Sequence, residues 1–281
     1  PCPPPDRPHP TIPPRTMTSP RTRPAATTEA ARQIRERGFA ILPDLLSAAQ
    51  TDVARDALDE VFDAEADIAT DRGWLTDAYR VAYMLPAKHD AFTTLWHRPQ
   101  AVDLARAVLG ADAVLAGFNG MTMLPRGEGQ SLHRDHPVPT PGVTLFINVV
   151  CALDPFVPAN GATRLVPGTH LSQTPASATI TADERSALEA RAIIPELAPG
   201  AAIAFAAALW HAAGRNTTDG QRRALHMFFA RPWVQPHWDF PASLPAEKAA
   251  SLTDEQRRLL GFGNFARRYD AATRRIIRPD R

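Results

Sequence analysis

The residue types best suited to chemistry gather in the segment QSLHRDH, residues 130–136. His133 and Asp135 are two positions apart, and on a strand that spacing places both side chains on one face. An imidazole and a carboxylate side by side can bind one metal ion, and His211, which follows the apolar run 201–209, is the best candidate for a third ligand. Two histidines and one carboxylate on one face of an iron ion leave the opposite positions open for a co-substrate and O2.

A His-x-Asp pair by itself is common in solvated loops, so its meaning depends on the elements that would hold it. Short runs rich in Val, Ile, Phe, Leu and Ala lie on both sides of the pair, and prolines and glycines separate them. This pattern is typical of the short strands and tight turns of a β-sandwich or barrel. The expected strands are residues 113–124, 143–153, 200–209 and 222–230.

Helical periodicity dominates the chain before these strands, with apolar residues three and four positions apart. Within that region, residues 39–46 (FAILPDLL) read as a short strand and a turn. A later insertion opens with a capping box formed by Thr181 and Glu184, which is typical of a helix start. The expected helices are residues 28–37, 46–66, 99–109, 181–191 and 253–260. We therefore expect a mainly β protein with an N-terminal helical layer packed on a double-sheet barrel, in a single domain over residues 27–281.

The first 26 residues differ in composition from the rest of the chain. They contain ten of the 28 prolines, with Arg, Thr and Ser between them. Such a segment forms neither a helix nor a paired strand, so we expect residues 1–26 to be a disordered tail outside the fold. The sequence does not begin with Met, and Met17 is an alternative start.

Charge and cysteine content exclude several classes of protein. There are 31 Lys and Arg against 30 Asp and Glu, a net charge of +1, which gives no reason to expect nucleic acid or an anionic membrane as a partner. No run reaches the roughly 18 apolar residues that span a bilayer. The two cysteines, Cys2 and Cys151, indicate no disulfide framework and fit a reducing cytoplasm.

Three motifs together resemble the phytanoyl-CoA dioxygenase family of iron(II)- and 2-oxoglutarate-dependent oxygenases. They are QSLHRD at 130–135, NGATRLVPGTH at 160–170 and WHAAGRNTTDGQRRALHMFF at 210–229. They occur in the family's order, and the resemblance spans roughly residues 35–240. It implies a double-stranded β-helix core (a jelly roll, cupin-like) and an oxidation that consumes 2-oxoglutarate and O2 at Fe(II).

The resemblance also implies a role for individual residues. By position, the three candidate ligands named above bind the iron. Arg222, eleven residues after the last of them, pairs with the distal carboxylate of 2-oxoglutarate. Gln130 and Thr163 match positions that commonly help to hold the co-substrate. A buried dicarboxylate needs a fixed cation, and a bidentate arginine supplies both the charge and the geometry.

Strand alternation distinguishes Arg222 from its neighbour Arg223. In the expected strand 222–230, the even positions mix small and polar groups, whereas the odd positions after Arg223 are continuously apolar. An apolar face packs on helices, whereas a mixed face suits a barrel interior that holds ligands. We therefore expect Arg222 to point inward together with His226, which becomes a candidate for contact with the substrate or with the metal ligands.

The remaining polar residues of the motifs have more ordinary interpretations. Trp210, His170 and Asn216 are expected to be structural, and Cys151 a small buried hydrophobe. His136 follows Asp135 directly, so its side chain is expected on the opposite face. Candidates for the wall of the substrate pocket are Tyr79, Arg80, Tyr83, Met84, Asn119, Met121 and His226.

The favoured function is oxidation of an unactivated C–H bond of a small molecule, with release of succinate and CO2. The product could arise by hydroxylation, desaturation, ring closure or epimerisation, and the Ala, Arg and Pro content favours bacterial specialised metabolism. Asp135 argues against a halogenase, in which a small residue replaces the metal carboxylate. Two alternatives stay open: a catalytically silent jelly roll that binds a small molecule, and a zinc hydrolase that uses the same ligands.

Overall fold

The computed structural model describes residues 24–135, 140, 142–172, 180–264, 268–270 and 272–277. The expected tail, except for its last three residues, lies outside this range, as do Met17 and His136. The first helix already begins at Ala25, two residues before the expected domain boundary.

Ten strands and nine α-helices occur in the described part of the chain. The strands are β1 (Phe39–Leu42), β2 (Tyr79–Ala82), β3 (Val114–Met123), β4 (Phe146–Ala152), β5 (Thr163–Leu165), β6 (Ala202–Ala206), β7 (His211–Ala213), β8 (Arg222–Ala230), β9 (Arg268–Asp270) and β10 (Arg275–Ile277). The helices are α1 (Ala25–Arg37), α2 (Ala48–Ala64), α3 (Ala66–Ala69), α4 (Leu85–Lys88), α5 (Pro99–Leu109), α6 (Ala182–Glu189), α7 (Phe240–Ser243), α8 (Ala246–Ala250) and α9 (Asp254–Leu259). Single 3-10 turns lie at Asp90–Thr93 and Thr169–Leu171.

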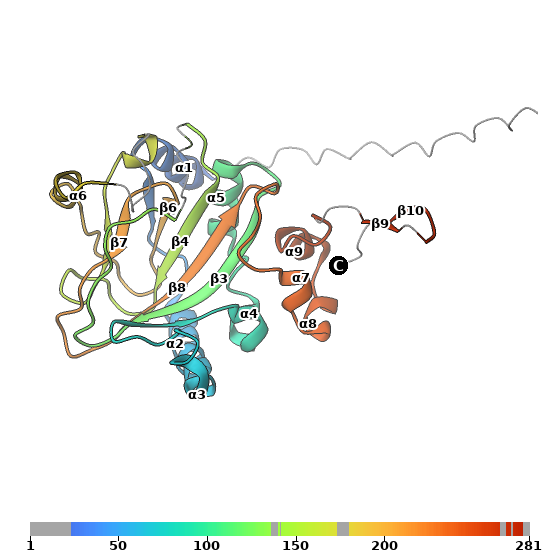
Figure 1. Ribbon diagram of the computed structural model, residues 1–281, viewed down its shortest axis with the longest axis horizontal. Coiled ribbons are helices and arrows are strands. Elements are labelled where there is room, and N and C mark those ends of the chain that lie inside the picture. Colours follow the sequence, from blue (N-terminus) through green and yellow to red (C-terminus); the bar gives the residue numbers. More distant parts are fainter. Residues whose placement is uncertain are drawn as a thin grey trace, which may run out of the picture.

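A six-stranded antiparallel sheet is the centre of the fold. Its strand order is β1-β6-β4-β8-β3-β2, and β4, β8 and β3 run side by side through the middle of the molecule (Figure 1). A shorter pair, β5 and β7, is separate from this sheet and is extended by a bridge between His133 and His211. The mainly β architecture with added helices agrees with the expected fold class.

The two faces of the main sheet carry different residues because strand positions alternate. One face packs on α1, α2 and α5 in the largest apolar cluster, which includes Leu225, Met227 and Phe229 of β8. The other face turns toward β5 and contributes to a second apolar cluster, which includes Val150 and Phe205. The site described below lies on this second, inner face.

Local signals placed the helices well. Helix α5 spans residues 99–109 as expected, and α6 begins with the expected capping box of Thr181 and Glu184. Helix α2 begins at Ala48, two residues later than the apolar pattern indicated, because Ser47 and Gln50 form a capping box there. Among the described helices, none has the length and apolar character needed to cross a membrane.

Candidate functional site

The three candidate metal ligands are brought together by one short antiparallel contact. His133 and His211 exchange two backbone hydrogen bonds of 2.9 Å, which aligns the segment before Asp135 with β7. The backbone N–H of Asp135 donates to the carbonyl of Ala207 at 3.1 Å and holds the next turn of the segment in place. One ligand atom from each of the three side chains lies within 4.8 Å of the others.

Both imidazoles are oriented by their own backbone. Nδ1 of His133 lies 2.9 Å from the carbonyl of Ser131, and Nδ1 of His211 lies 2.9 Å from the carbonyl of Leu209. A carbonyl can only accept, so Nδ1 carries the proton and Nε2 keeps its lone pair for a metal. The two Nε2 atoms lie 3.7 and 3.5 Å from the carboxylate oxygens of Asp135, too far for direct hydrogen bonds. The donors therefore converge on a common point, as a metal site requires.

Asn148 orients the carboxylate of the site. Its side chain lies on the inner face of β4, is 2% exposed, and donates from Nδ2 to Oδ2 of Asp135. Sequence reasoning missed this residue. The signal that could have revealed it is an amide at the centre of the apolar strand FINVVCA, because a buried amide needs a partner.

A cavity of about 250 Å³ opens beside the three ligands. All six residues predicted to bind metal or co-substrate line it, together with apolar and polar side chains of the inner face. The lining residues are Tyr79, Val81, Tyr83, Asn119, Gly120, Met121, Gln130, His133, Asp135, Asn148, Val150, Thr163, Phe205, His211, Ala212, Ala213, Arg222, His226 and Phe228.

Arg222 is a buried cation with unused hydrogen-bonding capacity. It is 2% exposed, its guanidinium lies 4.3 Å above the ring of Phe156, and one nitrogen donates to the carbonyl of Gly161 at 2.9 Å. Its Nε has no hydrogen-bond partner among the described residues. Burial lowers the pKa of Arg222 to about 10, which leaves it charged at neutral pH. A buried charged donor of this kind is stabilised by a bound anion, and the planar guanidinium matches the geometry of a carboxylate.

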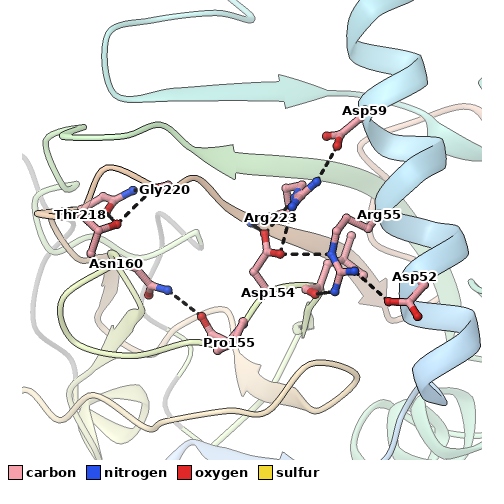
Figure 2. A network of polar contacts seen from close by, with 11 residues as sticks. Asp52, Arg55, Asp59, Asp154, Pro155, Asn160, Thr218, Gly220 and Arg223 are labelled. Atoms are coloured by element: carbon pink, nitrogen blue, oxygen red, sulfur yellow. Dashed lines mark hydrogen bonds and ion pairs between the residues drawn. The ribbon is translucent and has the colours of Figure 1, made fainter.

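Arg223 points the opposite way. Its Nε lies 2.9 Å from Oδ2 of Asp154, and another of its nitrogens pairs with Asp59 on α2 (Figure 2). Asp154 thus forms its direct ion pair with Arg223. The expected register of the strand, with Arg222 inside and Arg223 against the helix, agrees with these contacts.

Gln130 and Thr163 line the same cavity as Arg222. The side-chain carbonyl of Gln130 accepts a hydrogen bond of 3.1 Å from the backbone N–H of Ala213, which fixes its amide at the cavity wall. Thr163 is buried on β5 and pairs with Ala213 across the ladder. Gly129 allows the segment before Gln130 to lie close to the backbone of Gly214, since a Cβ at position 129 would lie 2.7 Å from that backbone.

Five of the seven candidates for the substrate pocket line the cavity, and two do not. Arg80 lies on the outer face of β2, with its guanidinium 4.6 Å from the centre of the Phe62 ring, because neighbours on a strand face opposite sides. Met84 packs into the cluster beneath the helices. The alternation that separates Arg222 from Arg223, applied to β4 and β6, would have added Val150 and Phe205 to the predicted wall.

Other residues of the motifs have structural roles, as expected. Trp210 is fully buried in a small apolar cluster, and Asn216 makes four hydrogen bonds within its own turn and to Leu124. His170 lies 3.1 Å from the carbonyl of Arg35, and burial lowers its pKa. Cys151 is buried, and burial raises the pKa of its thiol to about 12.

Comparison with known proteins agrees with this geometry. The sequence profile of the phytanoyl-CoA dioxygenase (PhyH) family matches residues 34–224. The chain is 26% identical over 250 residues to dioxygenase af480 of Aspergillus fumigatus, covering 84% of this chain and 77% of the relative. In structure it is similar to the non-haem α-ketoglutarate-dependent carbocyclase SnoK from nogalamycin biosynthesis (TM-score 0.60, 20% identity, 73% of this chain and 83% of SnoK). It is also similar to the epimerase SnoN, solved with Fe3+, α-ketoglutarate and nogalamycin RO (TM-score 0.58, 19% identity, 75% and 85%).

Proposed function

Because the chain belongs to the phytanoyl-CoA dioxygenase family of non-haem dioxygenases, we propose that its inner cavity uses Fe(II) and 2-oxoglutarate to oxidise a C–H bond of a small molecule. Under this proposal, His133, Asp135 and His211 hold the iron. Arg222 binds the distal carboxylate of 2-oxoglutarate, and Gln130 and Thr163 help to position that co-substrate.

One observation carries most of the proposal: Arg222, whose Nε has no partner among the described residues, shares a cavity with the three converging ligands. The metal chemistry of a hydrolase does not itself require a second fixed cation beside the metal. A dicarboxylate that reaches both the metal and Arg222 explains the two features together. This is why we favour an oxygenase over a zinc hydrolase on the same ligands.

The protein supplies position and charge, while the bound groups supply the oxidising power. Iron, 2-oxoglutarate and O2 together provide an oxidant that removes hydrogen from carbon, with release of succinate and CO2. The backbone carbonyls hold both imidazoles in one tautomer, and Asn148 holds the carboxylate of Asp135. Arg222 fixes one end of the co-substrate, so that its other end faces the metal ligands.

We further propose a substrate from specialised metabolism. The relatives named above include a fungal dioxygenase, and the similar fold of SnoN was solved with nogalamycin, a small molecule. The cavity suits such a compound because apolar side chains from β2, β3, β4, β6 and β8 line it. Hydroxylation, desaturation, ring closure and epimerisation all begin with hydrogen removal, so one set of metal ligands serves each of them.

The test is a succinate-release assay over a panel of candidate substrates. The full chain is loaded anaerobically with Fe(II) and 2-oxoglutarate, O2 is then admitted, and succinate is measured with and without each compound. We expect substrate-dependent succinate with iron but not with zinc, and none from the His211→Ala protein. Turnover that is supported by zinc and independent of 2-oxoglutarate would favour the hydrolase instead.

A further inference from the structure

His226 is a half-buried polar residue that has no part in the proposed iron and co-substrate sites. It lies on the inner face of β8 and lines the cavity, two same-face positions beyond Arg222. Four residues of strand separate the two side chains by roughly 13 Å at the backbone, longer than the five-carbon chain of 2-oxoglutarate. A co-substrate held at Arg222 therefore leaves His226 free for another ligand.

One ring nitrogen of His226, Nε2, is buried and has no hydrogen-bond partner among the described residues. Burial, and next the charge of Arg222, lower the pKa of His226 to about 4, so the ring is neutral near pH 7. A buried imidazole nitrogen without a partner costs free energy, and a ligand that bonds to it recovers that cost.

Asn119 lies directly opposite His226 and completes a polar pair. The two residues face each other across β3 and β8, and both line the cavity. The side-chain oxygen of Asn119 is already occupied, because it accepts from the backbone N–H of Met84 at 3.2 Å and from Nε1 of Trp238 at 3.0 Å. Asn119 can therefore offer only its amide N–H groups, which suit an acceptor oxygen.

The rest of the cavity wall offers no counter-ion for a charged substrate. Apart from the three proposed metal ligands and Arg222, the described lining residues have uncharged polar or apolar side chains. Around the polar pair the wall is mainly aromatic and aliphatic. Tyr83 lies just after β2, Met121 lies on β3 and Phe228 lies on β8. A charged substrate group there would lose its hydration without gaining a counter-ion.

We propose that His226 and Asn119 bind an oxygen atom of the substrate, and that the substrate is an uncharged, largely apolar compound with a carbonyl or hydroxyl group. This inference rests on the proposed function for its placement of 2-oxoglutarate at Arg222. It assigns the β3–β8 end of the cavity to the substrate and makes His226 its polar contact.

The test uses four probes that share one ring and differ in their polar group: cyclohexanone, cyclohexanol, cyclohexanecarboxylate and cyclohexylammonium. Binding to the full chain is measured by equilibrium dialysis under anaerobic conditions, with Fe(II) and 2-oxoglutarate saturating. We expect the ketone and the alcohol to bind at least roughly tenfold more tightly than either charged probe, the ratio expected from one hydrogen bond without a desolvated charge.

Variants of the cavity wall distinguish the effect of its hydrogen bonds on probe binding from the effect of its shape. His226→Phe should weaken ketone binding roughly tenfold by removing the hydrogen bond, and His226→Gln should restore part of it. Met121→Leu, a control that alters the wall without changing its polarity, should shift all four probes equally. A charged probe that binds as well as the ketone, no binding of the ketone, or an unchanged ketone affinity in His226→Phe would overturn the inference.

Calorimetric titration of 2-oxoglutarate into the same protein keeps the two claims apart. Tight 2-oxoglutarate binding without any preference for the ketone contradicts only the role of His226. A preserved ketone preference in a protein that binds no 2-oxoglutarate contradicts only the proposed function.

Discussion

Two adjacent arginines show how one residue position decides a role. Arg222 lies inside the fold, and its Nε has no partner in the part of the chain that the structure describes, whereas Arg223 lies between Asp154 and Asp59 with its charge neutralised. Strand geometry alone causes the difference, because successive side chains face opposite sides. Only Arg222 can therefore meet a ligand in the cavity.

Replacing each arginine should affect 2-oxoglutarate binding very differently. Arg222→Ala should weaken binding by about 3 kcal/mol or more, the typical cost of truncating one member of a buried charge pair. Arg222→Lys should recover only part of this, because an ammonium is a point charge without a planar fork. The measurement is the dissociation constant of 2-oxoglutarate at saturating Fe(II) without O2. Arg223→Ala is the matched control and should barely change this dissociation constant. A larger effect in Arg223→Ala than in Arg222→Ala would show that the assigned register of β8 is wrong by one residue.

Asn148 should control metal affinity through Asp135. Losing its hydrogen bond frees the carboxylate to rotate, and loss of such a supporting contact typically costs roughly 10–100-fold in metal affinity. Asn148→Leu, which keeps the branching and the number of side-chain heavy atoms, should therefore weaken Fe(II) binding by that factor in an anaerobic competition with a chelating dye. An iron affinity equal to that of the unaltered protein would show that the contact does not position Asp135.

Among single residues, the sequence identified side chains that line the cavity but missed Asn148, which supports one of them. The two-residue spacing and strand alternation are local rules, so His133, Asp135 and Arg222 were accessible to them. The partner of Asp135 was not, since Asn148 comes from a strand whose pairing depends on the whole sheet. Arg80 was assigned to the pocket because the strand β2 was not predicted at all.

Helix α2 is joined to the start of β8 by a network of charges. Asp154 accepts from the backbone N–H of Arg223 at 2.8 Å and pairs with its guanidinium and with Arg55 of α2 (Figure 2). Arg55 also pairs with Asp52, one turn earlier in the helix. The network fixes the first residues of β8, and with them the place of Arg222.

Breaking this network should cost stability. Asp154→Ala removes the carboxylate that bonds to the side chain and the backbone N–H of Arg223, at a site where both side chains are 15% exposed, so we expect a loss of about 2 kcal/mol in the free energy of unfolding. Urea unfolding measures it. Asp219→Ala is the matched control, because Asp219 pairs with Arg126 on the surface and should contribute less than about 1 kcal/mol. Equal losses in the two proteins would contradict a buried role for Asp154.

The elements that the sequence missed are short. Strands β2, β5 and β7 have three or four residues each, too few to show a period of two. They are stabilised by neighbours distant in the chain: β2 pairs with β3, and β5 pairs with β7. Long periodic elements such as α5 and β8 were predicted because their own residues determine them.

Over the whole molecule, the site is assembled from parts of the chain that are far apart in the sequence. The cavity takes residues from β2 (residues 79–82) to β8 (residues 222–230), and only the folded chain brings them together. His170 connects the turn after β5 to the end of α1 through the carbonyl of Arg35. Burial lowers the pKa of His170 and of His226, so folding keeps both rings neutral.

Stability should consequently fall in mild acid. The unfolded chain binds protons on histidine below about pH 6.5, while the folded chain resists, so unfolding takes up protons and becomes easier as the pH falls. Metal-free protein should therefore show a smaller free energy of unfolding in urea at pH 5.5 than at pH 7.5. His170→Gln, which can still donate to Arg35, should reduce this difference; an unchanged difference would contradict the burial of a neutral ring.

The central claim is that one cavity holds iron at His133, Asp135 and His211 and 2-oxoglutarate at Arg222. The most direct test is an anaerobic crystal structure of the protein with both bound, with data collected at the iron absorption edge. We predict one anomalous peak, which marks an iron ion bonded to Nε2 of both histidines and to the carboxylate of Asp135. We also predict that a carboxylate of 2-oxoglutarate pairs with Arg222. Iron on other residues, or a co-substrate turned away from Arg222, would contradict the account.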